Sequence, residues 1–229
     1  RGEALEKGFP SVHMVGKAGE APPRLIDLRG PKRSKSKQAV KTVTLVGKGV
    51  CFDTGGLNLK PAGNMLLMKK DMGGAAHVLG LAKMIWSLKL PIDLRVLIPA
   101  VENNVSHNAM RPMDVVKARN GKTIEIGHTD AEGRVTLADA LSYACEENPD
   151  LLIDLTTLTG AARVALGTDI PALFGNNSQD LEQLQKLSWQ VHDPLWTLPL
   201  HSGYQSQVEG QTADITNSGN SPFAGAITA

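Results

Sequence analysis

Strand-length apolar runs alternate with stretches of helical periodicity from residue 43 onward, and this alternation constrains the fold most strongly. The apolar runs cover residues 43–46, 94–101 and 151–155. Apolar residues recur with helical spacing in residues 72–88, 136–147 and 181–191. Because strands without polar alternation are buried on both faces, we expect an α/β domain whose β-sheet is flanked by helices on both faces.

Two further patterns refine the expected domain. Residues 115–126 contain Asn120-Gly121 between apolar stretches, a strong signal for a hairpin turn, so the sheet is expected to be mixed. Residues 1–40 carry no sustained pattern and are predicted to be an irregular lead-in to one domain over residues 41–229. Pro222 precedes small residues, as at a helix start. We therefore expect a C-terminally truncated piece of a longer polypeptide.

The composition disfavours several kinds of protein. The 229 residues carry a formal net charge of +1, which indicates neither nucleic acid nor a membrane as a partner. No apolar run approaches the roughly 20 residues of a membrane span. The only cysteines are Cys51 and Cys145, so we expect no disulfide framework. We also expect a cytoplasmic location, where thiols stay reduced. The basic run at residues 32–37 is interpreted as a solvated loop, because no aromatic residues interleave it.

Charged residues adjoin the buried segments at three places. Lys48 and Asp53 follow the first predicted strand among four glycines, and ligands bind beyond the carboxyl ends of strands in open α/β sheets. Asp71 stands before a Gly- and Ala-rich helix, where alone it fits a helix N-cap. Asp130 and Glu132 are two residues apart, a spacing that places both side chains on one side of extended backbone.

Together these carboxylates predict a metal site. Four are involved: Asp53, Asp71, Asp130 and Glu132. If they converge, their charges repel one another unless cations neutralise them. Two divalent ions balance the four charges if Lys48 is neutral, and nearby cations lower the pKa of an ammonium group. Oxygen ligands suit Zn²⁺, Mn²⁺ or Mg²⁺, and bridging carboxylates hold two such ions about 3.5–4 Å apart.

These residues resemble the signature of a known family. Lys48, Asp53, Lys60 and Asp71, with the string TDAEGR at residues 129–134, are similar in type and spacing to the leucyl aminopeptidase family of cytosolic di-zinc exopeptidases. Residues 154–161 resemble the family's substrate-pocket loop, and the resemblance covers residues 43–229. It implies the leucyl aminopeptidase catalytic domain, with a separate N-terminal domain absent from this chain.

The resemblance implies a role for each metal ligand. Asp53 and Glu132 are expected to bridge the two ions, and Asp130 to complete the more tightly held site. Lys48 and Asp71 are expected to complete the exchangeable site. The implied cofactors are two divalent metal ions, Zn²⁺ with Mn²⁺ or Mg²⁺ as alternatives at the exchangeable site.

The resemblance also implies how peptides are cleaved. Lys60 is expected to polarise the scissile carbonyl, and Arg134 to hold a bicarbonate ion that acts as general base. Four residues match positions lining the pocket for the first residue: Met68, Thr157, Leu158 and Gly160. The expected substrates are peptides with a free N-terminus, with Leu and other apolar residues preferred, and the expected assembly is a homohexamer.

One position departs from the family pattern. His128 stands before Thr129, where the family usually has Asn. We interpret it as a tolerated polar replacement. The alternative is an altered metal affinity or pH dependence, since imidazole titrates near neutral pH.

Other functions fit the sequence less well. A two-metal phosphatase or nuclease would need a phosphate-binding loop or an Arg cluster. The chain also lacks the GxSxG and HExxH motifs of serine hydrolases and thermolysin-like peptidases. Some relatives serve as DNA-binding architectural factors, and DNA binding stays open but unsupported by this chain. An inactive homologue is disfavoured because the ligand set is complete.

Overall fold

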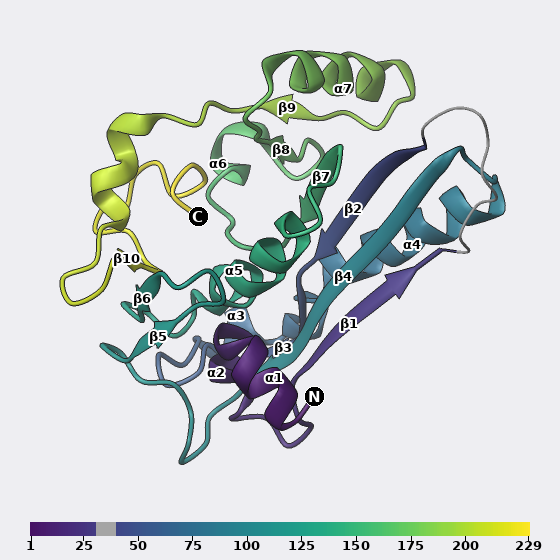
Figure 1. Ribbon diagram of the computed structural model, residues 1–229. Coiled ribbons are helices and arrows are strands. Elements are labelled where there is room, and N and C mark those ends of the chain that lie inside the picture. Colours follow the sequence, from purple (N-terminus) through teal and green to yellow (C-terminus); the bar gives the residue numbers. More distant parts are fainter. Residues whose placement is uncertain (31–39) are drawn as a thin grey trace. The chain divides into compact units, whose positions relative to one another are not determined.

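The computed structural model describes residues 1–30 and 40–229, shown in Figure 1. The basic run at residues 32–37 lies outside the described residues. The chain forms two compact units. The first contains Arg1–Thr157 and Gly210–Asn217, and the second contains Leu158–Glu209 and Ser218–Ala229.

The first unit is built on a mixed five-stranded sheet. The strands are β1 (Arg24–Arg29), β2 (Lys41–Gly47), β3 (Gly49–Asp53), β4 (Ile92–Asn103) and β7 (Leu151–Leu155). Their order is β1-β4-β2-β7, with β3 also paired to β4. Strands β2, β3, β4 and β7 run parallel, whereas β1 is antiparallel to β4. The apolar runs therefore form the parallel part of the sheet, as their lack of polar alternation predicts.

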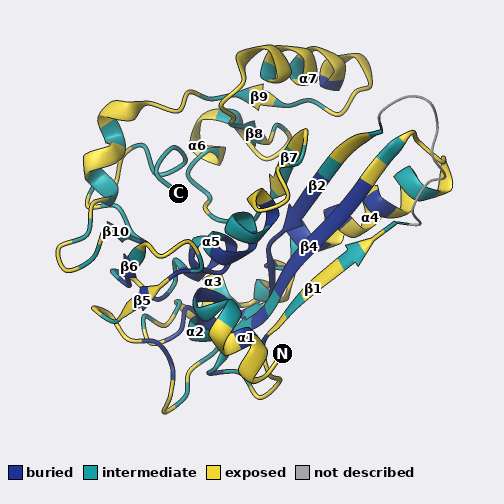
Figure 2. Cartoon of the chain, viewed as in Figure 1, coloured by how far each residue is buried: buried dark blue, intermediate teal, exposed yellow. Residues whose placement is uncertain are grey.

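Helices cover both faces of this sheet, which confirms the expected fold class (Figure 1). On one face Leu94, Val96 and Ile98 pack against α4 (Gly73–Ser87). On the other, Val101 packs with apolar residues of α2 (Pro10–Gly16) and α5 (Glu132–Cys145). Because side chains alternate along a strand, β4 can serve both cores. Figure 2 shows its middle buried between the two layers.

The hairpin predicted around Asn120-Gly121 is present, but it belongs to a separate sheet. Strands β5 (Val115–Lys117) and β6 (Thr123–Glu125) pair antiparallel. Strand β10 (Ile215–Thr216) adds to β6 in parallel and completes three strands. The main sheet is therefore mixed because of β1, and the expectation that the hairpin makes it mixed was wrong.

Three other expectations about local structure were wrong. Within the predicted irregular lead-in, the described residues 1–30 hold α1 (Glu3–Gly8), α2 and β1. Helix α5 begins at Glu132, four residues before the expected start. No helix starts at Pro222, where the described residues form bends and turns. The first error concerns elements that distant contacts stabilise. Within α2, the backbone N–H of Ser11 donates to buried Asp139 at 2.7 Å.

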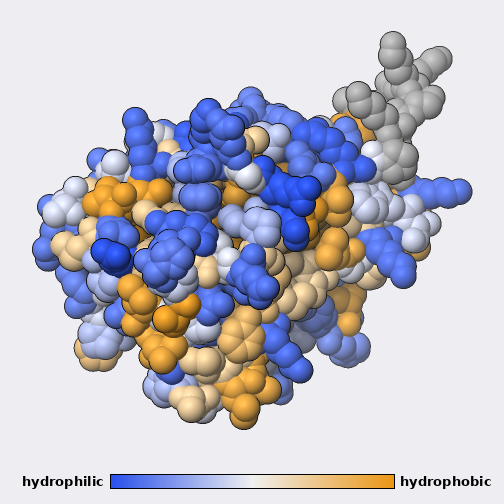
Figure 3. Space-filling model, turned by 90° about the horizontal axis from the view of Figure 1, so that it is seen from below, coloured by the Kyte–Doolittle hydropathy of each residue, from blue (hydrophilic) through white to orange (hydrophobic). Residues whose placement is uncertain are grey.

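The remaining elements are short apart from α7. The first unit also contains α3 (Ala62–Met65) and the 3₁₀ turn η1 (Met68–Lys70). The second unit contains α6 (Arg163–Leu166), β8 (Ala172–Leu173), α7 (Ser178–Gln190), β9 (Trp196–Thr197) and η2 (Ser202–Val208). On the face drawn in Figure 3, hydrophobic side chains lie in separate patches between polar ones. Among the described helices, none has the length and apolar content needed to cross a membrane.

Candidate metal centre

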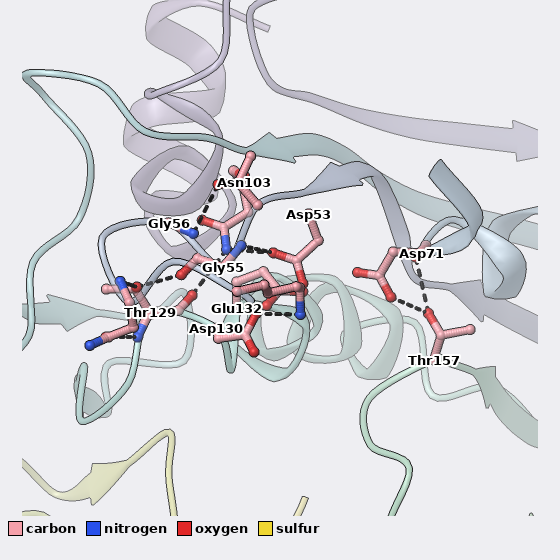
Figure 4. Close-up of polar contacts among 12 residues, drawn as sticks. Asp53, Gly55, Gly56, Asp71, Asn103, Thr129, Asp130, Glu132 and Thr157 are labelled. Atoms are coloured by element: carbon pink, nitrogen blue, oxygen red, sulfur yellow. Dashed lines mark hydrogen bonds and ion pairs between the residues drawn. The ribbon is translucent and has the colours of Figure 1, made fainter. Parts of the chain in front are cut away.

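The predicted ligands meet in the first unit, beyond the carboxyl ends of β2 and β3 (Figure 4). Lys48 joins the two strands, and Asp53 is the last residue of β3. Asp71 ends the η1 turn, just before α4. Asp130 lies in the turn before α5, and Glu132 is the first residue of that helix. The extended backbone expected for this last pair was therefore wrong, yet both carboxylates reach the same site.

Lys48 is fixed by both its backbone and its side chain. Its N–H donates to the Leu155 carbonyl at 3.1 Å, and its carbonyl accepts from Ala75 of α4 at 2.9 Å. Its Nζ lies 2.7 Å from Asp71 Oδ2 and 2.9 Å from Glu132 Oε1. Its side chain is only 3% exposed and that of Glu132 only 1%. The ammonium group is thus a buried positive charge between two carboxylates.

Lys60 forms the second such arrangement. Its Nζ lies 2.8 Å from Asp53 Oδ2 and makes an ion pair with Asp130 Oδ1. The backbone N–H of Lys60 donates to the Thr54 carbonyl at 2.9 Å, which folds residues 54–60 back on themselves. Gly55 makes this loop possible: its φ is +90°, and a Cβ there would lie 2.6 Å from the Asn58 carbonyl oxygen.

The helix that follows Asp71 approaches the sheet unusually closely. A Cβ on Gly74 would lie 1.9 Å from the carbonyl oxygen of Leu155 in β7. Only glycine fits at this contact, because any side chain would have to displace the backbone of one element. The Gly-rich start of α4 therefore brings Asp71 next to Lys48, which follows the end of β2.

Burial and charge shift the pKa values of the central groups. Burial, opposed in part by Lys48, raises the pKa of Glu132 to about 8. Burial also raises the pKa of Asp130, although the hydrogen bond from Lys60 acts in the other direction. Burial disfavours the ammonium of Lys48, but Glu132 and Asp71 outweigh it and raise its pKa. For Lys60, hydrogen bonds to Asp130 and Asp53 likewise outweigh burial and raise the pKa. The protein thus keeps both lysines charged while it raises the proton affinity of Asp130 and Glu132.

The donor set suits divalent cations. Asp53, Asp130 and Glu132 each offer a carboxylate oxygen, and these three atoms lie within 4.8 Å of one another. Hard divalent ions prefer such oxygen ligands. The two lysines place positive charge among these oxygens, as expected for carboxylates that cannot stay buried uncompensated. The residues present therefore fit the predicted metal ions.

Two residues beside the ligands were not identified from the sequence. Asn103, at the end of β4, donates from Nδ2 to Asp53 Oδ1 at 2.8 Å and to the Thr129 carbonyl at 3.0 Å. Thr129 donates from Oγ1 to the Gly55 carbonyl at 2.6 Å. Outer residues of this kind orient metal ligands. A position at the carboxyl end of a central strand was the only signal that pointed to Asn103.

The other residues predicted from the sequence, which are not metal ligands, lie at several places in the chain. Thr157 donates from Oγ1 to Asp71 Oδ1 at 2.8 Å, and its carbonyl accepts from Lys48 Nζ at 3.1 Å. Arg134 lies on α5 two residues after Glu132, and burial lowers its pKa. Met68 opens η1 in the first unit. Leu158 and Gly160 belong to the second unit. The substrate-binding roles of these residues stay predictions.

Several known proteins are similar to this chain in sequence and fold. The catalytic-domain model of the cytosol aminopeptidase family matches residues 1–229. A probable cytosol aminopeptidase of Pseudomonas fluorescens (strain SBW25) is 46% identical over 224 residues, covering 98% of this chain and 44% of that relative. One from Sulfurihydrogenibium sp. (strain YO3AOP1) is 44% identical over 229 residues, covering 99% of this chain and 44% of that relative.

A solved structure is also similar to this chain. The 1.8 Å crystal structure of a cytosol aminopeptidase from Coxiella burnetii matches with a TM-score of 0.93 and 56% identity. The match covers 99% of this chain and 48% of that one. The chain thus spans less than half the length of these relatives. Since the family model matches every residue of it, the chain belongs to the cytosol aminopeptidase family, in the part that forms the catalytic domain.

Proposed function

We propose that the protein is a metal-dependent aminopeptidase that removes the N-terminal residue from peptides by means of two metal ions. The observation that carries this proposal is the convergence of three acidic side chains, Asp53, Asp130 and Glu132, within 4.8 Å in a cytosol aminopeptidase catalytic domain. The names of the relatives support the proposed reaction, and the carboxylate oxygens of the site support the proposed metal ions.

The two metal positions are assigned to two groups of ligands. Asp53, Glu132 and Asp130 would hold the tighter ion, and Lys48 with Asp71 would complete the exchangeable one. When bound, two divalent ions lower the pKa of a water molecule and polarise the scissile carbonyl. Zn²⁺ is the proposed metal, with Mn²⁺ or Mg²⁺ as alternatives at the exchangeable site.

The chain's own residues would orient and stabilise the reacting groups. The raised pKa of Lys60 keeps its ammonium charged at neutral pH, so it can stabilise negative charge that develops on the carbonyl oxygen. Arg134 would hold a bicarbonate ion through paired N–H donors, and that ion would supply a general base. Arg134 lies two residues after Glu132 at the start of α5, which supports this assignment.

The substrate and the setting of the reaction are proposed from the family resemblance. Met68, Thr157, Leu158 and Gly160 would line an apolar pocket for the first residue, with a preference for Leu. We further propose a cytoplasmic homohexamer that acts on peptides with a free N-terminus. None of these proposals involves nucleic acid or a membrane.

The test is hydrolysis of leucine p-nitroanilide by the complete protein, with and without chelator, followed by Zn²⁺ or Mn²⁺ addition. N-acetylated leucine p-nitroanilide is the matched control substrate. Turnover that the chelator abolishes, metal restores and acetylation prevents would support the proposal. No turnover with metal demonstrably bound would refute it.

A further inference from the structure

The amide of Asn217 binds the loop that carries the metal ligands. Its Oδ1 accepts from the backbone N–H groups of Gly127 at 2.8 Å and His128 at 3.2 Å. Its Nδ2 donates to the carbonyls of His128 at 2.9 Å and Ala131 at 3.1 Å. One side chain therefore fixes four backbone groups of residues 127–131, the segment that contains Asp130 and leads into Glu132.

Asparagine is the side chain that this position requires. An amide offers two donor hydrogens and one oxygen that accepts two bonds, and all four are used here. An aspartate would face two carbonyl oxygens with no hydrogen to donate. Asn217 is 2% exposed, so water cannot replace the missing bonds.

The loop has only limited support of its own. The N–H groups of Ala131 and Asp130 donate to the carbonyl and Nδ1 of His128 at 3.1 and 3.2 Å. The loop must hold Asp130 and Glu132 close to Asp53, although their like charges repel one another. Side chains outside the loop add to its support: Asn58 and Asn103 bind the backbone of Thr129, and Asn217 binds the backbone on either side of it.

Asn217 ends a segment that is itself fastened to β6, and we name residues 210–217 the strap. Asp214 Oδ2 accepts from the N–H and Oγ1 of Thr123 at 2.7 and 2.8 Å. Glu125 Oε2 accepts from the N–H and Oγ1 of Thr212 at 2.8 and 2.6 Å. Strand β10 lies in the strap and pairs with β6. The strap can therefore act as a rigid support for the amide of Asn217.

We propose that Asn217 is a positioning residue of the metal centre, which holds residues 127–131 so that Asp130 and Glu132 face Asp53. This inference rests on the proposed function, because it assigns the loop to metal binding. Asn217 acts through the loop backbone and is not itself a ligand.

The test compares Asn217→Ala with Asp214→Ala in the complete protein. Both variants remove hydrogen bonds of the same strap, but only the first removes bonds to the metal-binding loop. Zn²⁺ alone is titrated into each metal-free protein by calorimetry. Asn217→Ala should bind Zn²⁺ about 10- to 100-fold more weakly, the usual effect of losing an outer-shell partner, while Asp214→Ala should match the unmodified protein.

A second variant and a second measurement test the same inference independently of the Asn217→Ala titration. Asn217→Asp keeps the acceptor for Gly127 and His128 but loses both donors, so we expect it too to weaken Zn²⁺ binding. Amide hydrogen exchange of residues 127–131 in the metal-free protein should quicken in both Asn217 variants and not in Asp214→Ala.

Equal losses of Zn²⁺ affinity in the Asn217 and Asp214 variants would show general loosening of the strap and overturn the proposal. Unchanged affinity and exchange in the Asn217 variants would overturn it as well. If the unmodified protein bound no Zn²⁺, the proposed function would fail separately. Hydrogen exchange would then still decide whether Asn217 holds the loop.

Discussion

The affinity of the metal centre should rise with pH, and the steepness of that rise shows whether Lys48 becomes a neutral ligand. In the metal-free protein, burial raises the pKa of Glu132 to about 8, so this carboxyl group keeps its proton near pH 7. Lys48 is also protonated, because its acidic neighbours raise the pKa of its ammonium in spite of burial. A group must lose its proton before it binds a metal.

The magnitude follows from the number of protons lost. Each released proton changes the apparent affinity about tenfold per pH unit below the pKa of its group. If Glu132 alone loses a proton, affinity should rise about 100-fold from about pH 6 to the pKa of about 8 and then level off. If Lys48 also does, the rise should approach about 10⁴-fold and continue above pH 8. The proposed ligand role of Lys48 predicts the second result.

Calorimetric titration of Mn²⁺ into the metal-free complete protein gives both quantities. Repeating the titration in buffers with different protonation enthalpies counts the protons released per ion. Lys48→Met should bind more weakly and release one proton fewer. Because Lys48 holds down the pKa of Glu132, the affinity of this variant should level off above pH 8. PH-independent affinity with no proton release would mean that Glu132 is ionised in the metal-free protein, and the argument from its burial would fail.

Three further perturbations test other parts of the structure. Lys60→Ala should lower kcat by about 10²- to 10³-fold and retain bound metal; loss of metal, measured by elemental analysis, would make Lys60 a ligand instead. Gly74→Ala should destabilise the protein by about 3 kcal/mol or more in urea unfolding, because its Cβ would lie 1.9 Å from the Leu155 carbonyl oxygen. Gly80→Ala in the same helix meets nothing within 4 Å and should stabilise it by about 1 kcal/mol, so equal effects would contradict the packing argument. Thr157→Val removes the hydrogen bond to Asp71 and should weaken exchangeable Mn²⁺ about 10-fold, measured by calorimetry, whereas unchanged affinity would limit Thr157 to other roles.

The fold could be predicted where the signal is local. Strands β2, β4 and β7 each contain a mainly apolar run, and α4 has apolar residues at helical spacing. The gathering of Lys48 and Asp53 with Asp71 also follows from local features. Each lies at a strand end or a helix start, and these positions meet at one edge of an α/β sheet.

The missed elements are those whose stability comes from distant residues. Helices α1 and α2 are too short to be stable alone. The buried carboxylate of Asp139 accepts from the N–H of Ser11 in α2, 128 positions away in the chain. The start of α5 was placed too late because Ala131 supplies no cap and Gly133 weakens the helical signal.

The supporting residues of the site could not be predicted for a related reason. Asn103 is 50 positions from Asp53 and 26 from Thr129, and Asn217 is 89 and 90 positions from the amides that it accepts from. Asparagine is common in turns, so its presence alone predicts nothing specific. Only the three-dimensional arrangement shows which groups these amides bind.

The way in which the lysines pair with the carboxylates bears on how the site forms. Each lysine lies between two acids, Lys48 between Asp71 and Glu132 and Lys60 between Asp53 and Asp130. Three of these carboxylates are buried, and each would cost the folded state several kcal/mol without compensation. The two ammonium groups offset part of this cost before any metal binds, and protonation of Glu132 offsets more. The metal-free protein is therefore expected to fold with its ligands already gathered, so that metal ions displace protons from an existing site rather than organise an unfolded one.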